Sequence, residues 1–126
     1  MLLGESLEDY LETIMILSEK GKVRSIDVAK LMEVSKPSVN KAVNNLKERG
    51  LITQETYGDI QLTQEGTKMA EAIFHRHKTI RSFLIDVLHV SVDTAEKDAC
   101  RIEHIISEET FQNILSCLKN NKENNS

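Results

Sequence analysis

A short break between two amphipathic segments most constrains how this chain can fold. Apolar residues at helical spacing predict a helix from just after Ser25 through about Met32. They predict a second helix from Ser35, its N-cap, to Gly50 at the usual C′ position. Pro37 stands in the first turn of the second helix, where a missing N–H costs little. The break between the two helices is only a few residues long.

Two β-prone runs follow, 51–55 and 59–63, and Thr56-Tyr57-Gly58 between them suits a hairpin turn. Helix, break, helix and hairpin form the order of a winged helix-turn-helix, whose second helix enters the DNA major groove. The alternative is a helical hairpin used only for packing. The residues expected to contact DNA lie at the start and on the exposed side of the second helix and at the hairpin tip. They are Ser35, Lys36, Pro37, Ser38, Asn40, Lys41 and Tyr57. Asn44 and Asn45 lie on the same exposed side of the helix.

Helical spacing recurs through most of the remaining chain. It predicts helices over about 7–20, with Ser6 as N-cap, and over about 64–88, capped by Thr63. Two more are expected over about 91–106 and 107–118. We therefore predict a mainly α protein with a winged helix-turn-helix DNA-binding domain at 1–63. A helical metal-binding and dimerisation domain at 64–119 and a disordered polar tail at 120–126 complete the expected organisation.

The charge distribution is uneven. The 126-residue chain has a formal net charge of -4, which by itself argues against a nucleic-acid partner. Residues 20–54, however, contain eight Lys or Arg and three Asp or Glu, a net charge of +5, whereas the remainder carries -9. A local basic segment can provide a footprint for phosphates in an acidic protein. Chance clustering on a solvated face is the alternative.

Several classes of protein are not indicated. No apolar run approaches the roughly 20 residues of a membrane span, and no signal peptide is visible, so no membrane partner is expected. Two cysteines make no disulfide framework, which favours a reducing cytoplasm. A nucleophile motif and a Gly-rich phosphate loop are missing, so we expect no enzyme; a metallohydrolase and a helical interaction module remain as alternatives.

A second constellation lies in the acidic part of the chain. Cys100, Glu103 and His104 stand at i, i+3 and i+4, so their side chains share one helix face. Thiolate, carboxylate and imidazole together form a ligand set for transition metals. Asp9 and Glu12 have the same i, i+3 relation on the first helix. Three helices can thus bring six candidate metal ligands together: Asp9, Glu12, His77, Cys100, Glu103 and His104.

Each candidate ligand also has a purely structural explanation. Asp9 can complete a capping box with Ser6, and Cys100 can be a small buried apolar residue. His77 can be a solvated residue on a long helix, and His75, two residues before it, is a rival ligand. A surface charge or an ordinary ion pair would account for the two remaining acidic residues, Glu12 and Glu103.

Four stretches resemble the DtxR/MntR family of iron- or manganese-dependent repressors. They are Glu8-Asp9-Tyr10-Leu11-Glu12, Val34-Ser35-Lys36-Pro37-Ser38-Val39, Arg76-His77 and, most specifically, Ala99-Cys100-Arg101-Ile102-Glu103-His104. The resemblance implies a homodimer that binds a palindromic double-stranded DNA operator when loaded with Mn2+ or Fe2+. It implies a short form without the SH3-like domain, a dimer interface on the helices after the wing, and these ligands: Asp9, His77, Glu103, His104 and Glu12.

The resemblance mixes two branches of that family. Asp9 and Glu12 fit the manganese branch, whereas Cys100 fits the iron branch. The second metal site of the iron branch would require an acid at Arg81 and a histidine at Glu96, so we do not expect it in its usual form. The alternative function is a winged-helix regulator that senses a redox signal or a small molecule, with Cys100 as the redox handle.

Overall fold

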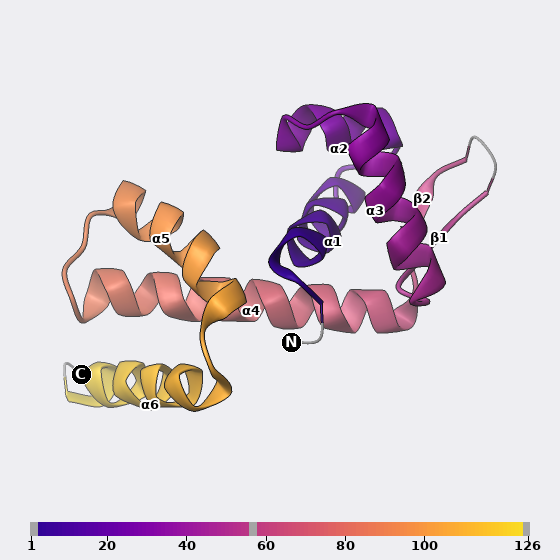
Figure 1. Cartoon of the computed structure of the whole chain (residues 1–126). Helices are drawn as coiled ribbons and strands as arrows, with labels where there is room; N and C mark the ends of the chain where they lie inside the picture. Colours follow the sequence, from indigo (N-terminus) through magenta and orange to yellow (C-terminus); the bar gives the residue numbers. More distant parts are fainter. Residues whose placement is uncertain (1–2, 56–57, 125–126) are drawn as a thin grey trace. The chain divides into compact units, whose positions relative to one another are not determined.

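The computed structural model describes residues 3–55 and 58–124 of the chain. Within these residues it contains six helices and one two-stranded sheet, which confirms the mainly α class (Figure 1). The chain divides into two compact units, Met1–Ala72 and Ile73–Ser126, which are described separately below. The elements are α1 (Glu5–Ser18), α2 (Ser25–Met32), α3 (Lys36–Glu48), β1 (Ile52–Gln54), β2 (Ile60–Leu62), α4 (Gln64–Asp86), α5 (Val92–Ile105) and α6 (Glu108–Asn124).

The turn between α2 and α3 confirms the predicted break. Ser35 is the N-cap of α3, and its side-chain oxygen accepts a hydrogen bond from the backbone N–H of Ser38 at 3.3 Å. Glu33 ends α2 in the left-handed conformation, with φ at 56°, where a glycine would adopt the same backbone without steric cost. Gly50, with φ at 75°, follows the end of α3 as predicted.

The start of α1 differs from the prediction. Gly4 is the N-cap, no side chain caps the helix, and the backbone N–H of Glu8 donates to Gly4 O at 3.1 Å. Ser6 therefore lies inside the first turn, and the predicted capping box of Ser6 with Asp9 is wrong. The sequence rules favour a serine cap, but the extended backbone of Gly4 lets the helix begin earlier.

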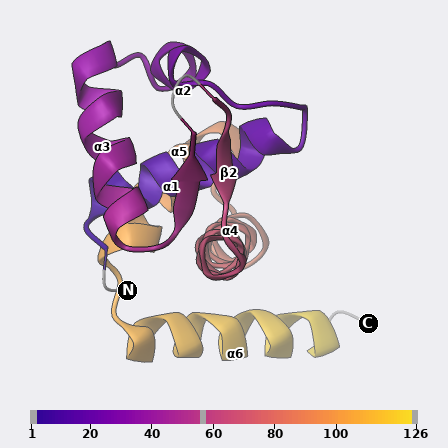
Figure 2. The same ribbon diagram turned by 90° about the vertical axis from the view of Figure 1, so that its right-hand side faces the viewer.

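The hairpin pairs β1 with β2 in antiparallel register, with Ile52 opposite Leu62 and Gln54 opposite Ile60. The backbone N–H of Ile60 also donates to Val23 O at 2.8 Å, which ties the hairpin to the segment before α2. Figure 2 shows the strands side by side, next to α1 and α3. Ile52 and Ile60 are buried, so the hairpin contributes to the core of the first unit.

The start of α4 is fixed to the hairpin by Thr63. Its hydroxyl donates to Gly50 O at 2.7 Å and accepts from the backbone N–H of Gly66 at 3.0 Å, which confirms the predicted cap. A Cβ on Gly66 would overlap the carbonyl oxygen of Leu51. Only glycine allows the helix backbone to come this close to the chain before β1.

The second unit has its own core, built from three helices. Ile80 and Leu84 of α4 pack with Ala95 and Ala99 of α5 and with Phe111 of α6. Both alanines are fully buried in this core. The packing of α5 on α4 brings polar groups of the two helices within contact distance.

The connection between α5 and α6 is held by Arg76. Its guanidinium donates to Ile106 O at 2.8 Å and lies 5.2 Å from the ring centre of Phe111. The helix α6 runs to Asn124, beyond the predicted end near Leu118. No glycine or proline interrupts this polar stretch, and a helix can continue through it. None of the described helices is long and apolar enough to cross a membrane.

Candidate metal centre

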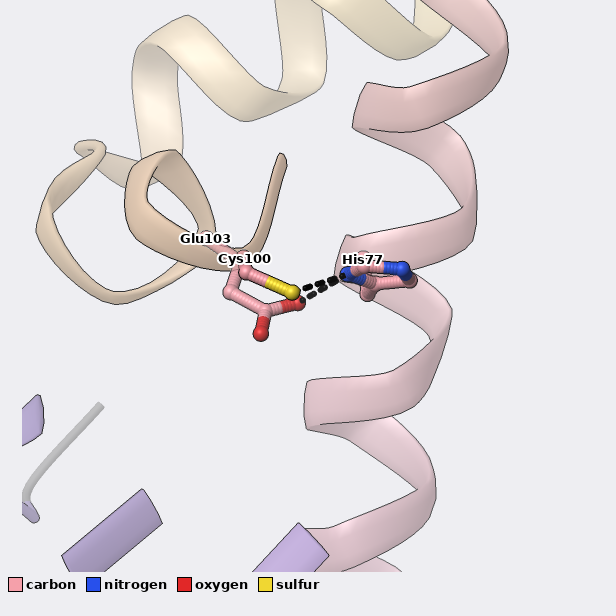
Figure 3. A group of neighbouring side chains, drawn as sticks. All are labelled: His77, Cys100 and Glu103. Carbon is pink, nitrogen blue, oxygen red and sulfur yellow. Dashed lines mark hydrogen bonds and ion pairs between the residues drawn. The ribbon is translucent and has the colours of Figure 1, made fainter. Parts of the chain in front are cut away.

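Three of the predicted ligands converge between α4 and α5. His77 Nδ1 lies 3.2 Å from Glu103 Oε2 and 3.8 Å from Cys100 Sγ, as Figure 3 shows. One ligand atom from each of the three residues lies within 4.8 Å of the others, a spacing that can hold a metal ion. The i, i+3 spacing on α5 places Cys100 and Glu103 on the side that packs against α4.

Glu103 is a buried carboxylate between two imidazoles. His104 Nε2 lies 3.3 Å from Glu103 Oε1, opposite the contact of His77 with Oε2. Within the described residues both carboxylate oxygens are buried and neither has a hydrogen bond of good geometry. Burial raises the pKa of Glu103, but the neighbouring His104 and His77 lower it by more, so its pKa lies below its ordinary value. The group is therefore a carboxylate at neutral pH, as a metal ligand must be.

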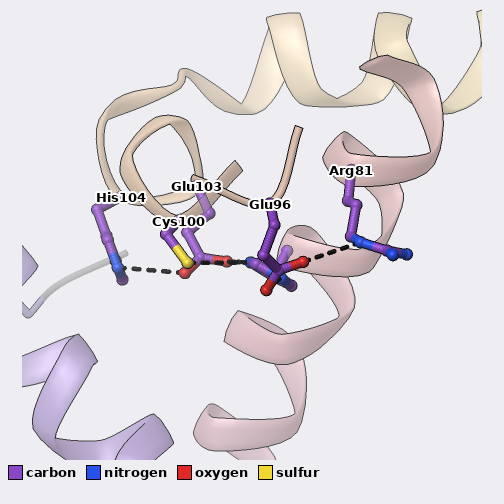
Figure 4. Close-up of polar contacts among 6 residues, drawn as sticks. Arg81, Glu96, Cys100, Glu103 and His104 are labelled. Atoms are coloured by element: carbon purple, nitrogen blue, oxygen red, sulfur yellow. Dashed lines mark hydrogen bonds and ion pairs between the residues drawn. The ribbon is translucent and has the colours of Figure 1, made fainter. Parts of the chain in front are cut away.

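Glu96 lies on the other side of the His77 ring. Its Oε1 is 2.9 Å from His77 Nε2, and its Oε2 is 2.8 Å from Arg81 Nε (Figure 4). The positions that the iron branch would use for a second metal site thus form an ion pair with each other. The sequence did not predict this pair, because it depends on the distance between two helices.

The structure decides between several of the alternatives. His75 is exposed, and its ring packs edge-on against Phe111 with the ring centres 6.0 Å apart, so His77 is the histidine that faces the site. Cys100 is exposed rather than a buried apolar residue. The described contacts of Glu103 are with imidazoles rather than with a lysine or arginine.

Asp9 and Glu12 lie on α1, in the first unit, and both are partly buried. Asp9 does not cap the helix, because α1 has no side-chain cap. Glu8, which was not predicted to be a ligand, is 1% exposed. The buried face of a helix is predicted from its apolar residues, so the sequence gives no signal that a glutamate is buried there.

The donors of the second unit fit a divalent transition metal. They offer imidazole nitrogen, carboxylate oxygen and thiol sulfur, a mixed set that suits iron, manganese and their neighbours rather than calcium or magnesium. Within the described residues neither oxygen of the buried Glu103 carboxylate has a hydrogen bond of good geometry, and this observation supports the fit most directly. The imidazoles compensate the buried charge in the metal-free protein, and a cation bound to their nitrogens would take over that role.

The predicted DNA-reading helix α3 has an apolar buried face and a polar exposed face. Val39, Ala42, Val43 and Leu46 are buried, whereas the polar candidates are exposed, namely Ser35, Lys36, Pro37, Ser38, Asn40, Lys41 and Asn44. Asn45 differs: it is partly buried, and its side-chain oxygen accepts a hydrogen bond from Arg49 Nε at 2.8 Å. Tyr57 lies outside the described residues.

Two family models match the chain. The model described as the N-terminal DNA-binding domain of iron-dependent repressors matches residues 2–60. The model described as their metal-binding and dimerisation domain matches residues 63–125. Neither description is of a redox sensor or of a sensor of small organic molecules.

Individual relatives agree with these matches. The chain is 32% identical to an HTH-type transcriptional regulator of Methanocaldococcus jannaschii, over 89% of this chain and 91% of the relative. It is 39% identical to the transcriptional regulator MntR of Escherichia coli, over 85% of this chain and 69% of the relative.

A solved structure of a manganese-dependent transcriptional repressor in complex with manganese superposes with a TM-score of 0.82 at 28% identity. The match covers 90% of this chain and 52% of that one, so the chain spans about half the length of that structure.

Proposed function

Because the chain belongs to the iron-dependent repressor family, we propose that it represses transcription in response to intracellular Mn(II) or Fe(II). In this proposal a homodimer binds a palindromic operator when it is loaded with metal, and so controls metal homeostasis in the cytoplasm. The proposal gives the chain no catalytic role. The observation that carries it is the convergence of His77 with Cys100 and the buried Glu103.

Six residues would hold the metal. His77, Cys100, Glu103 and His104 supply donors from the second unit, and Asp9 and Glu12 supply carboxylates from α1. The support for the second group is that both acids are partly buried on one side of α1, and that Asp9 is not used as a cap. A bound divalent cation supplies positive charge that these carboxylates share.

The charges of the ligands provide the switch. Without a cation, the carboxylates of Asp9, Glu12 and Glu103 repel one another wherever they approach. Metal binding therefore favours the arrangement in which α1 and the α4–α5 pair contribute to one site. Since α1 packs against α3 within the first unit, an ion held partly by α1 biases the placement of the reading helix.

The exposed face of α3 would read DNA. Lys36 and Lys41 can neutralise phosphates, and Ser38 and Asn40 can donate to base edges in the major groove. In a two-fold dimer, the two α3 helices must be spaced by about one turn of DNA, about 34–36 Å, to enter adjacent major grooves. Tyr57 at the hairpin tip would add a contact to the neighbouring backbone.

The test is DNA binding as a function of metal. Fragments bound by the full-length protein are selected from random duplex DNA with Mn(II) present, and affinity for the selected site is then measured anaerobically with Mn(II), Fe(II) or chelator. We expect palindromic sites, and metal should tighten binding by about 5–150-fold, the usual range of allosteric coupling. Equal affinity in chelator and in metal would overturn the proposal.

A further inference from the structure

Glu96 links two residues of α4 that stand one helical turn apart. Its two carboxylate oxygens are used separately: Oε1 is 2.9 Å from His77 Nε2, and Oε2 is 2.8 Å from Arg81 Nε (Figure 4). On α5, Glu96 precedes Cys100 by four residues and Glu103 by seven, so all three share the side that packs on α4. Arg81, Glu96 and His77 therefore form a chain of contacts that ends at the candidate metal centre.

This chain of contacts determines how the His77 ring is turned. An ionised carboxylate can only accept hydrogen bonds, so Glu96 accepts from the N–H on Nε2 of His77. With Nε2 held in this way, the ring presents its other nitrogen, Nδ1, on the opposite side. Nδ1 is the atom that faces Cys100 Sγ at 3.8 Å and Glu103 Oε2 at 3.2 Å.

Arg81 in turn keeps Glu96 in place. Its guanidinium is always charged, so it favours the ionised carboxylate and the rotamer that points Oε1 at His77. The side chains of Arg81 and Glu96 are 39% and 51% exposed, whereas that of His77 is 8% exposed. A solvent-accessible ion pair thus orients a buried imidazole.

We propose that Glu96, anchored by Arg81, is a positioning residue that holds His77 with Nδ1 directed toward Cys100 and Glu103. The inference rests on the proposed function, because it gives His77 a metal to bind. It gives positions 81 and 96 a new role. In the iron branch these positions would hold a second metal, whereas here Arg81 and Glu96 orient the His77 ring that binds the metal. Partners of this kind commonly contribute about 10–100-fold to metal affinity.

The experiment compares full-length variants that change one part of the contact chain at a time. Glu96→Ala removes the acceptor. Glu96→Gln keeps an oxygen that can accept from Nε2–H but loses the charge that Arg81 holds. Arg81→Ala removes the anchor. Asp98→Ala is the matched control, because it removes an acid from the same helix about 200° away from Glu96.

Two readouts separate positioning from a general structural effect. Nitrogen NMR of ring-labelled histidine in the metal-free protein reports whether Nε2 of His77 donates a hydrogen bond to Glu96. Titration with Mn(II) and Co(II) alone reports affinity. We expect Glu96→Ala to remove the signature of that hydrogen bond and to weaken metal binding by about 10–100-fold. Glu96→Gln should restore part of both, Arg81→Ala should have a smaller effect, and Asp98→Ala should match the parent.

The outcomes distinguish this inference from the proposed function. If the parent binds metal through His77, but Glu96→Ala leaves the Nε2 signal of His77 unchanged or weakens binding no more than Asp98→Ala does, the positioning role is wrong and the metal centre stands. If the parent and a His77→Ala variant bind Mn(II) and Co(II) equally weakly, the metal centre itself is wrong, and the positioning role fails with it. Unfolding midpoints of all variants show whether any loss of affinity reflects loss of structure.

Discussion

The reading helix and the α4–α5 centre use their polar side chains in opposite ways. Lys36, Asn40 and Lys41 on α3 are exposed, and the helix is held from behind by its apolar face. His77 and Glu103 are buried, and each contacts other ionisable groups. A surface that binds DNA, a long charged polymer, needs many accessible donors, each of which contributes a small part of the binding free energy. A site for one small cation needs few donors, fixed in advance and shielded from water.

This contrast predicts that a single change in the metal centre has the largest effect. Glu103→Gln keeps the shape of the side chain but removes the buried negative charge. We expect the response of DNA affinity to Mn(II) to be lost, a change of up to about 150-fold. The measurement is fluorescence anisotropy on the selected operator, with and without metal.

The control for this loss is Glu109→Gln, the same charge change at an exposed position on α6. His104→Ala should lose the response as Glu103→Gln does, with the dimer still folded. A full metal response in either centre variant would remove that residue from the ligand set.

The second prediction concerns the backbone contact between the start of α4 and the segment that follows α3, rather than the exposed surface of α3. Gly66→Ala places a Cβ against Leu51 O, and one of the two backbone segments must shift. Forcing extra atoms into a packed contact costs about 1–3 kcal/mol, which denaturant titration followed by circular dichroism measures. Gly4→Ala is the comparison variant, because a Cβ at Gly4 has nothing within 4 Å and the change loses only the preference of an N-cap for glycine over alanine. Equal stability of the two variants would contradict the close approach of α4.

The two regions also differ in how much of them the sequence predicts. For α3, periodicity, the Ser35 cap, Pro37 and Gly50 predicted the helix and its exposed side. All of these signals are local, so they can be recognised within one short stretch of the sequence. Asn45 is the exception on that side: it is partly buried, and its side-chain oxygen accepts a hydrogen bond from Arg49.

For the metal centre, local signals predict only part of the site. The i, i+3, i+4 spacing on α5 grouped Cys100, Glu103 and His104. His77 was a further candidate on a neighbouring helix, and the resemblance implied that it is a ligand. The burial of α4 offers a further signal, because His77 shares a face with Ile73 and Ile80, whereas His75 does not. The Arg81–Glu96 pair could not be predicted in this way, because it depends on how the core residues of α4 and α5 pack these two helices together.

A third effect is confined to acid pH. Because the pKa of Glu103 is lower in the folded protein than its ordinary value of 4.5, the ionised group stabilises the fold. This stability is present above the unfolded pKa and is lost as pH falls through the folded pKa. In chelator, the free energy of unfolding should therefore decline more steeply in the parent than in Glu103→Gln between pH about 6 and about 3. Parallel curves would mean that the two imidazoles do not stabilise the carboxylate.

The smallest effect is expected on the exposed side of α3, and it tests the other half of the comparison. Lys41→Ala removes one charge from a solvated surface, so the fold and the metal response should persist while operator affinity falls a few-fold. If Lys41 neutralises one phosphate, the slope of log affinity against log salt becomes shallower by about 0.9. Lys119→Ala on α6 makes the same charge change away from the reading helix and should leave the slope unaltered. An identical slope for the two variants would exclude Lys41 from the phosphate contacts. A lost metal response in Lys41→Ala would contradict the separation of roles, because an exposed reading residue would then influence the buried centre.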